Sequence, residues 1–466
     1  MRKKYHPHHL LLSMVGLLLN LAGGCAKFID IKPPTTQLVT SSVFASDAAA
    51  TAAMTGIYGN MSGSHGFAGQ LTGSTSLLLG LYADELENFS TNQNQAAFYT
   101  NALSAANTDV SSDLWAQPYQ DIYDANAVIE GLAGSSGVSD PVKNELTGEA
   151  KFIRAFCYFY LVNFFGEIPL ITSTNYQANA VAARNTSAQV YDQIVTDLQD
   201  AQNLLPDDYS ISDGERIRPN KAAASALLAR VYLFTNDWTD AEAASNAVIS
   251  DPLYSLPALD SVFLANSAEA IWQFKPVLPN INTTEGNIFI LTTTPQFVAL
   301  SNQVLQAFEP EDLRRTDWVD SITVGTNTYY YPFKYKVKTG TTLTEYSMVL
   351  RLGEQYLIRA EARAKQGNVF GAQSDLNMIR QRAGLPPTAD STADELAVAI
   401  LHERQVELFT EWGHRWFDLK RTDNADAVME IVTPLKGGSW NTDFQLFPIP
   451  KSEILVDQQL TQNPGY

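Results

Sequence analysis

The sequence predicts a mostly α-helical protein, built on tetratricopeptide-like helical repeats, with a loop-rich, short-strand part packed on the helical body. Three observations predict this class. Apolar residues recur at helical spacing between residues 112 and 165, a helix–turn–helix pattern occurs twice, and residues 253–349 are rich in Thr, Asn, Tyr and Pro. With 45% hydrophobic and 17% charged residues, the 466-residue chain can bury a large core.

Two apolar stretches predict long helices. In residues 112–131, Leu114, Ile122, Ala125 and Ile129 fall on one face, and Gly131 is the expected end of the helix. In residues 145–165, apolar side chains lie nearly all round the predicted helix. We therefore expect this second helix to be buried on most sides.

A repeated pattern follows these helices. From residue 222 onward, Tyr232, Trp238 and Ala241 have the spacing of a tetratricopeptide repeat, and the arrangement returns around Ala360 and Ala372. A unit of about 34 residues cannot bury its own apolar face, so copies stack on their neighbours. We expect degenerate copies at residues 114–165 and 190–205.

Two stretches differ from this helical texture. Residues 59–112 are rich in Gly, Ser, Asn and Gln, and residues 253–349 contain short alternating runs at 288–291 and 329–335. Residues 253–349 are predicted to form loops and short strands laid over the helical scaffold, and residues 59–112 a second variable, loop-rich stretch. Ligand recognition usually lies on loops of this kind.

The N-terminus predicts export and a lipid anchor. A basic start precedes an apolar run at residues 10–22 that is too short to span a membrane comfortably, so residues 1–24 are interpreted as a signal peptide. Cys25 follows two glycines, as in bacterial lipoprotein signals. That likeness implies cleavage before Cys25 and attachment of several acyl chains such as palmitate, because one chain anchors only marginally. A disulfide between Cys25 and Cys157 is the alternative, although Cys157 is expected to be a core thiol.

Composition and motifs exclude several function classes. The formal net charge of -19 argues against nucleic acid as a partner. His402 and Glu403 open like a zinc helix, but Val406 stands where the second histidine must be. Neither a G-x-S-x-G elbow nor a phosphate-binding G-x-x-x-x-G-K-[ST] loop occurs. We therefore predict no catalytic residue, no metal and no cofactor.

Eight sequence blocks follow one another behind the lipoprotein signal. They are GEAKFIRAFCYFYLVNFFGEIPL (148–170), VYDQIVTDLQDAQNLLP (190–206), AAASALLARVYL (222–233), LRLGEQYLIRAEARAKQG (350–367), DLNMIRQRAGL (375–385), ERQVELFTEWGHRWFDLKR (403–421), LFPIP (446–450) and QNPGY (462–466). In this order they resemble the SusD/RagB family of outer-membrane nutrient-binding lipoproteins. The resemblance implies a SusD-like helical part at residues 25–252 and a RagB/SusD part with variable loops at residues 253–466.

The same resemblance implies a function and partners. It implies a non-enzymatic receptor that binds glycans and delivers them to a SusC-like TonB-dependent transporter. Such a receptor is lipid-anchored in the outer membrane, faces the cell exterior and covers the transporter as a lid.

A dense group of charges near the C-terminus could be mistaken for an active site. Glu403, Glu407 and Glu411 are spaced four residues apart and are expected on one helix face. The group also contains Arg404, His414, Arg415, Asp418 and Arg421. Since opposite charges follow at once, we interpret the group as a partly buried ion-pair network.

The candidate ligand-binding residues come from the two variable stretches. A sugar site needs flat rings for pyranose faces and polar groups for hydroxyls. The residues that we select are Asp84, Asn88, Phe89, Tyr99, Trp318 and Tyr330. Trp115 and Trp272 lie in periodic or strand-like sequence and are expected in the core.

Two other functions stay open at this point. A surface glycoside hydrolase would use two of the fifty acidic residues, and a tetratricopeptide scaffold would bind only protein. Peptide or another nutrient could also replace the glycan as ligand. Release of reducing ends would identify the hydrolase, and a stable protein complex without glycan affinity would identify the scaffold.

Overall fold

The computed structural model describes residues 40–63 and 73–466. The chain divides into residues 1–43 and a compact unit, Phe44–Tyr466. Of the first, only α2 (Thr40–Val43) is described. The predicted signal peptide and Cys25 lie outside the described residues.

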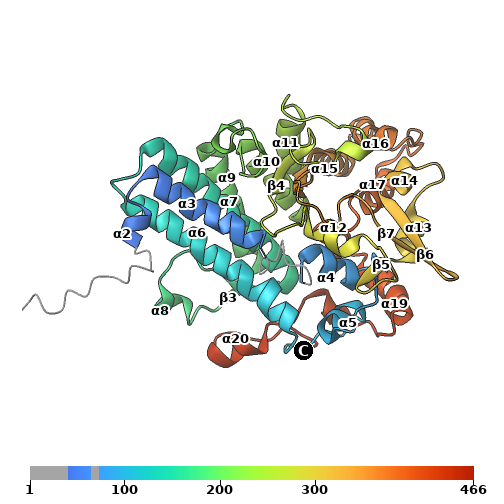
Figure 1. Cartoon of the computed structure of the whole chain (residues 1–466), viewed down its shortest axis with the longest axis horizontal. Helices are drawn as coiled ribbons and strands as arrows, with labels where there is room; N and C mark the ends of the chain where they lie inside the picture. The colour runs from blue at the N-terminus through green and yellow to red at the C-terminus, as the bar shows by residue number, and fades with distance from the viewer. Residues whose placement is uncertain (1–39, 64–72) are drawn as a thin grey trace, which may run out of the picture. The chain divides into compact units, whose positions relative to one another are not determined.

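The compact unit is mostly helical, as predicted (Figure 1). Its helices before residue 253 are α3 (Asp47–Met61), α4 (Thr75–Tyr82), α5 (Gln93–Tyr99), the π-helix η1 (Val110–Ala116), α6 (Gln117–Gly134), α7 (Asp140–Phe165), α8 (Tyr176–Asn179), α9 (Ser187–Leu204), the 3-10 helix η2 (Ser210–Ser212), α10 (Lys221–Phe234) and α11 (Trp238–Ile249). The later ones are the 3-10 helix η3 (Leu259–Ser261), α12 (Thr284–Phe289), α13 (Asn302–Ala307), α14 (Leu313–Asp317), α15 (Leu352–Lys365), α16 (Val369–Arg382), α17 (Ala393–Glu407), α18 (His414–Arg421), α19 (Ala425–Leu435), the 3-10 helix η4 (Thr442–Gln445) and α20 (Lys451–Val456).

The longer helices form one continuous array. Along the chain, α6 packs against α7, α7 against α9, and so on through α10, α11, α15, α16 and α17. Helix α11 therefore contacts α15 although about a hundred residues of chain separate them. Ala229, Leu233 and Ala241 from α10 and α11 share a core cluster with Ile358 and Ala362 from α15. The observed helix pairs are consistent with the repeats, whose tetratricopeptide assignment stays a prediction.

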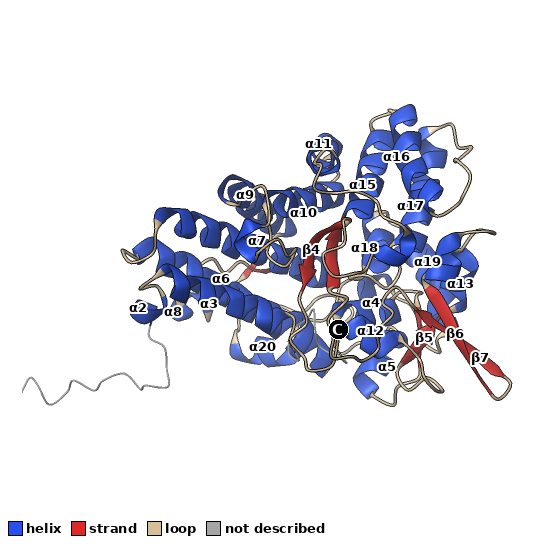
Figure 2. Ribbon diagram, turned by 45° about the horizontal axis from the view of Figure 1, so that its top comes forward, coloured by secondary structure: helices blue, strands red, loops and turns tan. Residues whose placement is uncertain are grey.

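In the described part of the chain, the strands form four two-stranded antiparallel sheets among the helices (Figure 2). They are β1 (Leu86–Asn88) with β5 (Val298–Leu300), β2 (Ile168–Pro169) with β3 (Arg184–Asn185), β4 (Ala270–Phe274) with β8 (Ser347–Arg351), and β6 (Val319–Val324) with β7 (Asn327–Pro332). Pairing of β4 with β8 closes the base of the segment between α11 and α15. That segment is thus an insertion into the helical array, carrying loops and short strands as expected. The division of the chain at residue 252 remains a prediction.

The core contains the aromatic residues expected there. Trp115 is 4% exposed and Trp272 is fully buried. Cys157 on α7 is a buried free thiol, and burial raises its pKa well above the ordinary value. Within the described ranges 40–63 and 73–466, no helix has the length and apolar character needed to span a membrane.

Several element predictions are wrong. Residues 288–291 belong to the end of α12 and the residues after it, because a short apolar run fits a buried helix as well as a strand. Residues 59–112 are partly helical, since the leucine-rich α4 lies within them. Gly131 lies inside α6, where its missing side chain leaves room for the ring of Phe44, and the helix ends at Gly134. Glu411 is not on α17, because that helix ends at Glu407 and Thr410 has a positive φ of 53°.

Candidate functional site

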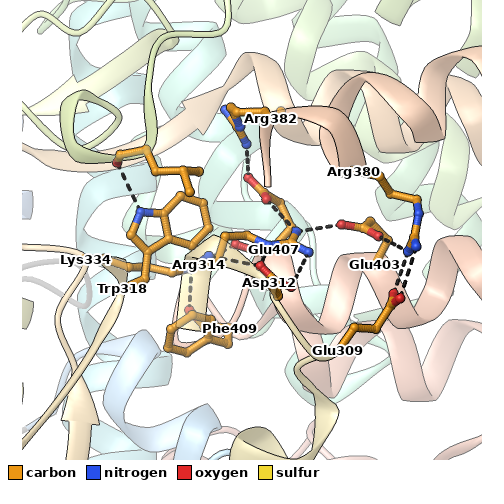
Figure 3. A network of polar contacts seen from close by, with 12 residues as sticks. Glu309, Asp312, Arg314, Trp318, Lys334, Arg380, Arg382, Glu403, Glu407 and Phe409 are labelled. Carbon is orange, nitrogen blue, oxygen red and sulfur yellow. Dashed lines mark hydrogen bonds and ion pairs between the residues drawn. The ribbon is translucent and has the colours of Figure 1, made fainter. Parts of the chain in front are cut away.

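The charged group near the C-terminus is a buried ion-pair network (Figure 3). The carboxylate of Glu407 is at its centre: Oε2 lies 2.9 Å from Nη1 of Arg314 and Oε1 lies 2.6 Å from Nη1 of Arg351. Arg382 also pairs with Glu407. Although burial alone would raise the pKa of Glu407, Arg382, Arg351 and Arg314 hold it well below the ordinary value.

The remaining members of the network pair with one another or with nearby elements. These pairs are Arg314–Glu403, Arg380–Glu403, Arg351–Glu411, Lys334–Glu411, Arg404–Asp418, Arg421–Asp418 and Arg415–Asp84. His414 is buried beside them, and burial together with the nearby arginines lowers its pKa. The expected ion-pair network is confirmed, and its burial is deeper than expected. These groups are paired and shielded from solvent, so they hold helices, strands and loops together inside the protein.

The two variable stretches of the sequence meet at the β1–β5 sheet. The ring of Phe89 lies edge-on to the ring of Tyr329 on β7, with centroids 5.6 Å apart. The amide N–H of Phe89 donates to the carbonyl oxygen of Phe297, 2.8 Å away, which extends the sheet by one pair. Because opposite residues of an antiparallel pair share one side, Phe89 and Phe297 lie on the same side as Glu87. We call Phe89, Phe297 and Tyr329 the aromatic face; Phe297 is 39% exposed.

A polar cavity of about 270 Å³ adjoins the same sheet. Strand β1, the end of α5, the start of α13 and α19 with its following residue form its walls. Its lining residues are Asp84, Leu86, Glu87, Tyr99, Ser301, Asn302, Gln303, Val432, Leu435 and Lys436. Glu87 therefore links the aromatic face with the cavity.

The charged side chains that line the cavity differ in whether they are free to bind a ligand. Glu87 is half-buried, its carboxylate has no hydrogen-bond or ion-pair partner within the described part of the chain, and burial raises its pKa. Burial and the nearby Glu87 also raise the pKa of Tyr99. The ammonium of Lys436 donates to three carbonyl oxygens at the end of α4, those of Leu81, Tyr82 and Ala83. Burial lowers the pKa of Lys436 to about 7. The cavity thus offers free hydrogen-bond acceptors, while its lysine is already engaged.

Comparison with known proteins agrees with this architecture. Residues 27–233 match a family described as "Starch-binding associating with outer membrane", and residues 301–466 match the SusD family. The SusD-like protein P2 of Formosa agariphila is 27% identical over 98% of this chain and 99% of its own length. This chain belongs to the SusD/RagB family.

Solved SusD/RagB structures share the fold. A SusD superfamily protein from Bacteroides vulgatus superposes with a TM-score of 0.79 at 21% identity, covering 90% of this chain and 99% of that one. Surface glycan-binding protein A from Bacteroides uniformis gives a TM-score of 0.76, also at 21% identity, with the same coverage of both chains. The predicted SusD-like fold is therefore confirmed.

In this SusD/RagB chain, four of the six predicted ligand residues lie at or beside the site. Phe89 belongs to the aromatic face and Tyr99 lines the cavity. Asp84 lines the cavity too, but its carboxylate is only 4% exposed and receives hydrogen bonds from Arg415 at 2.8 and 2.7 Å. The side-chain oxygen of Asn88 accepts from the amide of Ser90, so Asn88 shapes the turn after β1.

The two other predicted residues face elsewhere. The expectation that Trp318 is exposed is wrong: it is fully buried, and its Nε1 donates to the carbonyl oxygen of Leu259 at 3.1 Å (Figure 3). Tyr330 packs under the guanidinium of Arg315, 4.8 Å from its ring centroid. Side chains alternate along β7, so Tyr329 and Tyr330 point to opposite sides and only Tyr329 joins the aromatic face.

Sequence reasoning missed Phe297, Lys436 and the role of Tyr329. Successive side chains of a strand point to opposite faces, so the sequence of residues 327–332 indicates that Tyr329 and Tyr330 point to opposite sides. It does not indicate which of the two sides contacts Phe89. For Phe297 the sequence holds no signal, because its neighbours at the site come from β1 and β7. Among residues 40–63 and 73–466, no group of three or more His, Cys, Asp or Glu side chains is placed to hold a metal ion.

Proposed function

We propose that this SusD/RagB protein is a glycan receptor of the outer membrane that binds sugar chains across the aromatic face and the polar cavity. The observation that carries the proposal is the contact between Phe89 and Tyr329 beside a cavity rich in free acceptors. Rings of this kind cover the apolar faces of pyranoses, while Glu87, Asn302 and Gln303 can bond their hydroxyls. The starch-binding description of the matched family supports the same ligand class.

Replacement of Tyr329 tests this proposal. Tyr329→Ala removes one ring from the aromatic face, and we expect a loss of about 1–2 kcal/mol, or roughly ten-fold in affinity. A printed array of plant, algal and bacterial glycans would identify a bound sugar, and calorimetric titration of that sugar would give both affinities. The melting temperature should change little, because Tyr329 is partly exposed at the edge of the insertion.

Phe370→Ala is the matched control. Phe370 on α16 is 83% exposed and lies outside the site, so its loss should leave glycan affinity unchanged. Equal affinity of Tyr329→Ala and wild type for every glycan bound would contradict the proposed site.

We propose that the protein does not hydrolyse the glycan that it binds. A glycosidase needs two carboxyl groups about 5–9.5 Å apart on either side of the scissile bond. In the cavity, Asp84 is held by Arg415, which leaves Glu87 as the accessible carboxylate among its described lining residues. We expect no release of reducing ends from a bound polysaccharide, and a sustained release that Glu87→Gln abolishes would establish a hydrolase instead.

We also propose lipid anchoring at Cys25 and delivery of the glycan to a SusC-like TonB-dependent transporter. The lipoprotein-like end of the signal peptide supports the anchor, and membership of the family supports the partner. Cys25→Ser should yield a protein that lacks acyl chains and leaves the membrane fraction. Retention of this variant in the membrane to the wild-type extent would show that Cys25 is not the anchor.

A further inference from the structure

A second cleft, of about 400 Å³, lies away from the aromatic face. One wall is the first half of α6 with the last two residues of η1, and another is α20 with the residues that follow it. The ends of β2 and α8 close it. Both views place α20 well to the left of the β6–β7 hairpin (Figures 1 and 2), and the cleft shares no lining residue with the polar cavity. The cleft is therefore separate from the site proposed above.

Aromatic rings line one wall of this cleft in a row. Trp115, Tyr119 and Tyr123 are spaced four residues apart, so they follow one helical face, and Trp115, only 4% exposed, is the buried end of this row. The rings of Trp115 and Tyr119 lie 5.0 Å apart, and the hydroxyl of Tyr119 donates to the carbonyl oxygen of Pro169. Tyr123 is 43% exposed and its hydroxyl has no partner among the described residues. Packing and a hydrogen bond thus hold Trp115 and Tyr119 in place, and Tyr123 is the exposed ring at the end of the row.

The opposite wall supplies hydrogen-bond acceptors. Glu453 and Asp457 lie one turn apart at α20 and are half-buried, and the amide side chains of Gln120 and Asn179 also line the cleft. The side-chain amide nitrogen of Asn179 donates to the carbonyl oxygen of Ser173. The side-chain oxygen of Asn179 can therefore accept a hydrogen bond from a ligand. Neither lysine, arginine nor histidine is among the lining residues described. This chemistry suits a neutral ligand with many hydroxyl donors and disfavours phosphates, sulfates and uronic acids.

We propose that this cleft is a second glycan-binding site, which holds a neutral segment of the same polysaccharide as the aromatic face; the inference rests on the function proposed above. Two sites on one rigid unit bind one long chain with an avidity that can exceed either affinity by about 10²–10⁴. A basic peptide is the other ligand that rings and carboxylates accept, and the measurements below separate it from a glycan.

Four proteins test the proposal: the wild type, Tyr329→Ala, Tyr123→Ala and the double variant. Each is titrated with maltoheptaose, laminarihexaose and the parent starch and laminarin, and is screened on the glycan array. We expect Tyr329→Ala to bind glycan more weakly than the wild type. The double variant should bind about ten-fold or more weakly than Tyr329→Ala. The preference of the wild type for the long polymer over the short oligosaccharide should disappear in Tyr123→Ala.

The control is Tyr176→Ala. Tyr176 on α8 is 73% exposed and does not line the cleft, so its removal should leave all glycan binding unchanged. Equal binding by the double variant and Tyr329→Ala overturns the second site while the proposed function stands. A Tyr123→Ala defect confined to basic peptides or to a transporter complex also overturns it. Absence of any wild-type glycan binding removes the proposed function and this inference together.

Discussion

Trp318 illustrates how the surroundings of a residue decide its role. Its ring lies 5.0 Å from Nζ of Lys334 and 5.5 Å from the ring of Phe263, and its indole nitrogen bonds a main-chain carbonyl. The guanidinium of Arg382 lies 5.9 Å from the same ring. Trp318 therefore shields part of the ion-pair network from water, whereas Tyr329, eleven residues later, belongs to the aromatic face.

Truncation of Trp318 should affect stability and leave recognition intact. Trp318→Ala removes a fully buried side chain, and we expect the free energy of unfolding to fall by about 3–5 kcal/mol. Thermal melts and glycan titration on the same protein measure both effects. A wild-type melting temperature with lost glycan affinity would contradict this assignment and return Trp318 to the binding surface.

At the scale of elements, small residues set the distance between the helices of the array. Ala241 on α11 and Ala372 on α16 are fully buried in the clusters that join neighbouring helices. Their methyl groups fit where longer side chains would push the helices apart. Ala241 and Ala372 hold corresponding positions in the repeated sequence pattern, and their burial agrees with that pattern.

A larger side chain should lower stability at a buried alanine of the array and have little effect at an exposed one. Ala372→Leu adds three carbons to a filled interface, and we expect a loss of about 1–3 kcal/mol in the free energy of unfolding. Ala243→Leu on the exposed side of α11 is the control and should change stability by less than about 0.5 kcal/mol. Denaturant unfolding measures both, and equal stability of the two variants would contradict close approach at Ala372.

At the scale of the whole compact unit, the buried network ties segments that are distant in sequence. Glu407 ends α17, Arg314 lies on α14, Arg351 ends β8 and Arg382 ends α16. One carboxylate thus links the insertion to the helical array. Ion pairs as deep as these contribute little net stability as a set, but each member is costly to remove alone.

Loss of the central carboxylate should therefore be severe. Glu407→Gln removes the one carboxylate that Arg314, Arg351 and Arg382 share. Their other carboxylate partners, Asp312, Glu403, Glu269 and Glu411, remain. We expect the broken pairs to cost about 3–5 kcal/mol in the free energy of unfolding. Glu242→Gln is the matched control, because its pair with Arg363 is partly exposed and should contribute about 0–1 kcal/mol. Similar unfolding midpoints for the two variants would refute the central role of Glu407.

The sequence by itself determined the helical class, the family, the burial of Trp115, Trp272 and Cys157, and the ion-pair character of residues 403–421. These properties follow from local patterns: apolar period, charge spacing and ordered motifs. Only the tertiary structure decided that Phe89, Phe297 and Tyr329 share one face, that Trp318 is buried and that residues 288–291 are not a strand. The physical reason is that exposure of a side chain depends on which distant segment packs over it, and no local pattern records that partner.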